Sequence, residues 1–182
     1  AVYRSMTGLQ ATSSFFAILF NNIRVAFLAF AAGILFSFGT GYILFYNGIM
    51  IGAFHYFFYE RDLLFTSILS IWIHGTLEIS AIIVAGCAGL IMGNSFLFPG
   101  TFSRMVSFKK GARIGLKIII GVAPVFTIAA ILESYVTRYT KMPMALSILI
   151  ITLSLIFVIW YYVIYPNTIL KREHEKGTQI CQ

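Results

Sequence analysis

Long apolar runs, separated by short polar clusters, make up most of the chain. The first run covers residues 15–59, far more than the roughly 20 residues that one helix needs to cross a bilayer, so the chain must turn within it. Asn47-Gly48 is a dipeptide that often forms turns, and we place the turn there. The pattern then predicts one span at about residues 22–43 and a shorter one at about residues 47–59.

The second long run, residues 63–98, lies between a charged cluster and a Pro-Gly pair. Glu60-Arg61-Asp62 marks a return to water, and Pro99-Gly100 ends the run. We expect an interruption at Gly75, so the run predicts a short helix up to residue 73 and a third span from residue 74 to residue 98.

Two more spans follow. The fourth covers about residues 114–135, where Pro124 is expected to kink the helix, and the fifth covers residues 144–165. Aromatic residues near the end of the fifth span, among them Trp160, suit the headgroup region of a bilayer.

Basic residues without any acidic neighbour gather between the third and fourth spans: Arg104, Lys109, Lys110, Arg113 and Lys117. By the positive-inside rule we expect this segment, and residues 104–113 in particular, in the cytoplasm. The alternation of the spans then gives a transmembrane domain (15–166) with a cytoplasmic tail (167–182) and an extracytoplasmic first segment (1–14). Because no signal peptide precedes the first span, we expect a further span upstream.

Composition agrees with a membrane protein. The chain of 182 residues is 59% hydrophobic and only 10% charged, whereas soluble domains carry roughly 25% charged residues. This excludes a soluble enzyme and a disordered chain. The net charge of +7 is explained by topology signals and does not indicate a nucleic-acid partner. The expected fold class is all-α: a polytopic transmembrane bundle of five spans, one of them broken near Gly75.

Small residues recur at four-residue spacing on two of the predicted spans. One series is Ala29, Gly33, Ser37 and Gly41, and the other is Ala81, Ala85, Gly89 and Gly93. Such series let membrane helices approach closely. Packing inside the bundle and a homo-oligomer face are both open interpretations.

Strongly polar residues inside the spans are the candidate site, as a binding or structural cluster: Asn22, Arg24, Asn47, His74, Glu78 and Glu133. His74 and Glu78 are four residues apart and share a helix face. Because an unpaired charge inside a membrane is costly, we expect Arg24 to pair with Glu78 or Glu133, and His74 with one of the acids. Most of these groups fall in the outer half of the bilayer.

Three interpretations of this cluster remain open. It ties helix ends together, binds a partner or ligand from outside, or serves a small transporter or channel. His74 and Glu78 would also offer two ligands to a membrane-embedded metal hydrolase. However, the two-histidine zinc-protease motif and the hydrolase and nucleotide-binding motifs are absent, so we expect no catalytic residue, no metal and no cofactor.

Several segments resemble the stage II sporulation protein M family. The resemblance rests on Asn21-Asn22-Ile23-Arg24, Asn47-Gly48, the segment from His74-Gly75-Thr76-Leu77-Glu78 to the Ala-Gly run at residues 85–89, and Glu133 followed by Thr137. It implies that Asn22, Asn47, His74, Glu78 and Glu133 are shared polar positions, and that an N-terminal region with a further helix precedes the chain.

The resemblance also implies a function. In spore formers the namesake is a membrane scaffold for peptidoglycan remodelling that works beside cell-wall hydrolases, and the family has no established catalytic residues. We therefore expect a non-enzymatic component of a cell-envelope assembly in the bacterial inner membrane, with lipid and envelope proteins as its partners. The transporter or channel, with a polar site in the outer leaflet, remains the alternative.

Overall fold

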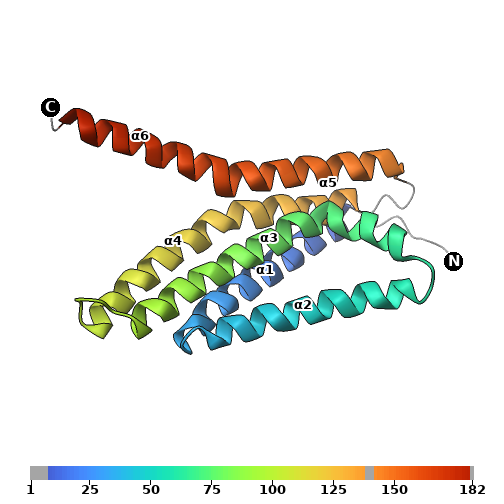
Figure 1. Ribbon diagram of the computed structural model, residues 1–182. Helices are drawn as coiled ribbons and strands as arrows, with labels where there is room; N and C mark the ends of the chain where they lie inside the picture. Colours follow the sequence, from blue (N-terminus) through green and yellow to red (C-terminus); the bar gives the residue numbers. More distant parts are fainter. Residues whose placement is uncertain (1–7, 138–141, 181–182) are drawn as a thin grey trace.

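The computed structural model describes residues 8–137 and 142–180, with side chains described for residues 12–137 and 142–172. Its described elements are all helical, as the sequence predicts (Figure 1). The regular helices are α1 (Gly8–Ala31), α2 (Phe38–Tyr59), α3 (Leu64–Leu97), α4 (Arg104–Ile131), α5 (Met144–Ile159) and α6 (Tyr165–Ile180). Three short segments complete them: η1 (Ala32–Ile34) and the π-helical η2 (Leu132–Val136) and η3 (Trp160–Ile164).

α3 is the central helix of the bundle, and α1, α2, α4 and α5 all pack against it. α1 runs parallel to α3, whereas α2 and α4 run antiparallel to it (Figure 1). The basic end of the bundle is the end that holds the turn at residues 35–37, the loop at residues 98–103 and the first turns of α4. The opposite end holds the turn at residues 60–63 and the start of α5.

Four helices of the described chain are long and apolar enough to cross a membrane: Thr12–Ile34, Leu64–Leu97, Arg104–Val136 and Met144–Arg172. The protein is therefore a multi-pass membrane protein. The fourth of these spans combines α5, η3 and α6, which follow one another without a break. The sequence predicts five spans, and the remaining one corresponds to α2, which interrupts its apolar residues with Asn47 and His55.

The first turn lies about ten residues before the predicted one. The chain reverses at residues 35–37, where Phe36 and Ser37 take positive φ angles of 51° and 69°. Asn47-Gly48 stays inside α2, because the Asn47 side chain donates a hydrogen bond to the Ile43 carbonyl one turn earlier. A helix keeps its own backbone groups paired, and here this outweighs the turn tendency of the dipeptide.

The predicted break near Gly75 is wrong. α3 is one helix of 34 residues, and Gly75 is buried within it. A Cβ atom at Gly75 would meet only the side chains of Ile71 and Ile79, at 3.6 and 4.0 Å. Glycine permits a break without requiring one, and here the helix continues. The predicted end of this run is confirmed, since α3 stops at Leu97 and Gly100 has a φ of 62°.

α4 begins earlier than predicted, at Arg104, so the basic residues occupy its first turns. The helix continues past Pro124 and changes to a π-helix at η2. The change is marked by a backbone hydrogen bond of 3.0 Å from Thr137 N to Leu132 O. Such single π turns often occur at functional sites.

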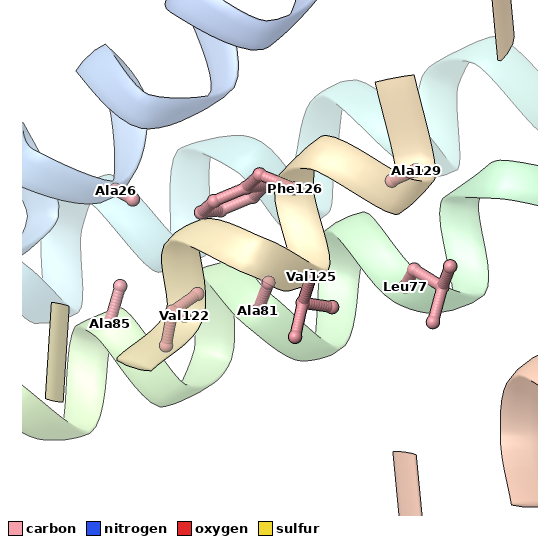
Figure 2. Close-up of a cluster of buried hydrophobic side chains, with 8 residues drawn as sticks. All are labelled: Ala26, Leu77, Ala81, Ala85, Val122, Val125, Phe126 and Ala129. Carbon is pink, nitrogen blue, oxygen red and sulfur yellow. The ribbon is translucent and has the colours of Figure 1, made fainter. Parts of the chain in front are cut away.

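The centre of the bundle is a core of small and branched side chains from α1, α3 and α4 (Figure 2). Its buried members are Ala26, Leu77, Ala81, Ala85, Val122, Val125, Phe126 and Ala129. Phe126 of α4 points toward α1 (Figure 2), and its side chain is almost completely buried.

Between this core and the basic end, glycines bring the helix backbones together. A Cβ atom at Gly89 of α3 would lie 2.6 Å from the Ala29 carbonyl oxygen of α1 and 2.5 Å from Thr40 Oγ1 of α2. A Cβ atom at Gly115 of α4 would lie 3.0 Å from the Ala88 carbonyl oxygen. The small residues of α3 therefore serve packing within the bundle.

Candidate functional site

A polar cluster lies directly beside the apolar core, on the side toward the opposite end. Its member from α1 is Asn22, whose side chain is only 8% exposed. Asn22 shares a helix face with Ala26 and Ala29, and this face packs against α3. Its Nδ2 donates a 2.5 Å hydrogen bond to Oε1 of Glu78. The cluster therefore links α1 to the central helix.

The acid and imidazole groups of the cluster come from α3 and η2. His74 and Glu78 lie on one face of α3, and Glu133 lies in η2. Each of the three side chains offers a ligand atom, and these atoms lie within 4.8 Å of one another. Two carboxylates and an imidazole at this distance can share a proton or bind a cation. The structure therefore brings together four of the six candidate residues: Asn22, His74, Glu78 and Glu133.

Thr137 also belongs to the cluster, although it was not among the candidate residues. Its Oγ1 lies 3.3 Å from Nδ1 of His74 and donates a 3.2 Å hydrogen bond to the Leu132 carbonyl. The sequence contained a signal for it: Thr137 follows Glu133 by four residues, a spacing that puts two side chains on one face of a helix.

Arg24 lies outside the cluster, and its predicted ion pair with Glu78 or Glu133 is wrong. Arg24 is exposed on α1, whereas Asn22, two residues earlier, is buried. Residues two apart in a helix point about 200° apart, so Arg24 faces away from α3. Within the described side chains it has no acidic partner.

Asn47 also lies outside the cluster. Its amide group is engaged with the Ile43 carbonyl of its own helix, at 2.8 Å. Farther along α2, Nδ1 of His55 contacts the Ile51 carbonyl and Nε2 accepts a hydrogen bond from Trp72 of α3. These bonds satisfy polar groups of α2 and do not form a second site.

A cavity lies beside the cluster, toward the opposite end of the bundle. It has a volume of about 430 Å³ and lies between α3 and the start of α5. Its lining includes Ser70, Ile73 and Ser147, and also Thr137, which contacts His74. On the other side of the cluster the apolar core and the glycine contacts close the bundle. The cavity therefore lies on the side of the cluster toward the opposite end, and Thr137 is the cluster residue that lines it.

Comparison with known proteins supports the resemblance that the sequence shows. The chain matches the family model of stage II sporulation protein M (SpoIIM) over residues 4–138, well over half of its length and including the whole polar cluster. Searches of curated proteins and of solved structures found no match. The chain therefore belongs to the SpoIIM family of membrane proteins.

Proposed function

We propose that the protein is a non-enzymatic scaffold that holds other membrane proteins in a bacterial cell-envelope assembly, such as one that remodels peptidoglycan. Membership of the SpoIIM family and the membrane-spanning helices support an envelope role. The role would need a surface within the membrane that binds other proteins.

The main support for the proposal is the exposed position of Arg24 within a membrane-spanning helix. Arg24 lies 12 residues from the start and 10 residues from the end of the span Thr12–Ile34. These spacings correspond to about 18 and 15 Å, so Arg24 is near the middle of a hydrocarbon core about 30 Å thick. An exposed guanidinium at this depth is costly, and an acidic side chain on a neighbouring transmembrane helix would neutralise it.

Other features of the surface fit the same role. Asn21 is exposed on the same side of α1 as Arg24, so a partner helix would meet both a charged and an amide group. Only 11% of the most apolar window of the span Met144–Arg172 is buried, which leaves a second broad face for lipid or protein.

The transporter or channel alternative gains no comparable support. It requires a water-filled path from the polar cluster to the basic end. That region contains the backbone contacts of Gly89 and Gly115 and the fully buried Ala88 and Thr40. Close packing of this kind counts against such a path.

Photo-crosslinking in cells tests the scaffold. A crosslinking amino acid at Phe20 or Leu28, which flank Arg24 on the exposed side of α1, should capture an envelope membrane protein through a segment that contains an acidic residue. Arg24→Leu should reduce this capture several-fold, whereas Arg113→Leu, which removes the same charge at the basic end, should leave it unchanged.

Leu149 on α5 is the control position for the crosslinker, because it is also exposed and lies on a different helix. Two results together would contradict the proposal. The crosslinker at positions 20 and 28 would capture only the proteins that it captures at position 149, and the purified chain would move a solute across liposome membranes.

A further inference from the structure

We propose that His74, Glu78 and Glu133 bind a divalent transition-metal cation, which fastens the central helix α3 to the end of α4. The inference goes beyond the scaffold role and revises the expectation of no metal, because the sequence alone shows only two of the three ligands side by side. The structure adds Glu133 from a segment 55 positions further along the chain than Glu78.

The first argument is charge. Glu78 and Glu133 are the acidic residues within the four candidate spans, and the fold brings them to the same place. Neither has an ion pair with a described basic side chain, since Arg24 of α1 faces away and the basic residues of α4 lie toward the basic end. Two neighbouring carboxylates and a neutral imidazole would form a neutral site with one divalent cation.

The second argument is the state of His74. Thr137 donates its hydroxyl proton to the Leu132 carbonyl, so its oxygen is free to accept a hydrogen bond from Nδ1 of His74. This leaves the lone pair of Nε2 available. Metal-binding histidines characteristically donate the other ring N–H in this way.

His55 provides a contrast within the same chain. Its Nδ1 lies 2.8 Å from the Ile51 carbonyl and its Nε2 accepts from Trp72, so both ring nitrogens already have partners among the described residues. In His74, by contrast, Nδ1 is hydrogen-bonded to Thr137, and the carboxylates of Glu78 and Glu133 lie close to the ring.

The geometry and the ligand types indicate the class of cation. Tetrahedral zinc with bonds of about 2.0–2.2 Å holds its ligand atoms about 3.4 Å apart, so side-chain shifts of about 1 Å would close a site whose atoms lie within 4.8 Å. An imidazole ligand favours zinc, copper, iron or nickel over magnesium, calcium and manganese, which prefer oxygen ligands. The cavity lined by Thr137 lies next to His74, on the side from which a cation would approach the site.

Zinc titration of the purified full chain tests the site. The chain in detergent is stripped with EDTA and titrated with Zn²⁺ against a chromophoric chelator. We expect one zinc ion per chain for the wild type and no stoichiometric binding for His74→Ala or Glu133→Gln. Asn22→Leu removes the amide that orients Glu78 and should weaken binding about 10- to 100-fold.

Two matched variants serve as controls: His55→Gln removes a histidine of α2, and Glu60→Gln removes an exposed carboxylate. Both should bind zinc as the wild type does. Zinc should also raise the melting temperature of the wild type and of both controls but not that of Glu133→Gln, which separates loss of the site from loss of the fold. Absence of zinc binding by the wild type, or equal binding by the ligand variants, overturns the proposal.

Discussion

At the scale of single residues, the hydrogen bond between Asn22 and Glu78 leads to a test that needs no metal. Glu78→Gln keeps an amide oxygen that accepts from Asn22, whereas Glu78→Leu leaves the buried donor without an acceptor. An unsatisfied buried donor costs about 1–3 kcal/mol. In EDTA and the same detergent, the Leu variant should therefore melt several degrees below the Gln variant.

Glu60 supplies the control for this comparison, because it is exposed at the turn after α2. Glu60→Gln and Glu60→Leu should melt at the same temperature as each other. Equal melting temperatures for the two Glu78 variants would contradict the role of the hydrogen bond.

The residue scale also shows what the sequence could predict of the site. Helical periodicity predicts that Asn22 and Glu78 face the packed interior, and the structure places both there. Periodicity also puts Arg24 on the other side of α1, but the cost of an unpaired charge led us to expect an inward ion pair. The sequence of one chain contains no information on other proteins, so the acidic residues of this chain were the only partners that we considered for Arg24.

At the scale of helices, the sequence predicts the approximate positions of the apolar segments but misplaces the first turn. A turn at residues 35–37 divides the long run into α1 of 24 residues and α2 of 22 residues, two helices of similar length. This division depends on packing, because Gly33 and Gly89 let α1 and α3 meet just before the turn. Local dipeptide tendencies do not contain this long-range contact.

Alanine substitutions at two glycines test the helix arrangement. Gly89→Ala would place its Cβ against the Ala29 carbonyl and Thr40 Oγ1, so α1 or α2 must move away from α3. Overpacking of this kind costs about 1–3 kcal/mol, and we expect a lower melting temperature in detergent.

Gly48→Ala is the matched control, because a Cβ there has no neighbour within 4 Å and the residue lies inside α2. Helix propensity predicts that it is neutral or stabilising, by up to about 1 kcal/mol. A strong loss of stability for Gly48→Ala would instead support a turn at Asn47-Gly48.

At the scale of the whole molecule, the question is whether α2 also crosses the membrane. α1 and α3 run in the same direction, as the pairs Asn22–Glu78 and Gly33–Gly89 require. The chain must therefore return along the length of the bundle between them, and α2, with 22 residues or about 33 Å, is long enough to do so. Asn47 donates one hydrogen bond to its own helix, and both ring nitrogens of His55 have partners on α2 and α3, which lowers the cost of burying these side chains in a membrane.

Cysteine labelling decides this point and the orientation of the protein together. In a background with Cys87→Ser and Cys181→Ser, single cysteines at Leu35, Asp62 and Lys110 are treated in intact cells with a thiol reagent that does not cross membranes. If α2 crosses and the basic end is cytoplasmic, only the cysteine at Asp62 reacts, and the other two react after the membrane is opened. If the cysteines at positions 35 and 62 react from the same side, α2 does not cross the membrane. If the cysteine at position 110 is labelled from outside, the orientation is the reverse of the expected one. The result also bears on the polar cluster, since the cavity lined by Thr137 lies toward the end that holds Asp62 and would then face the outside.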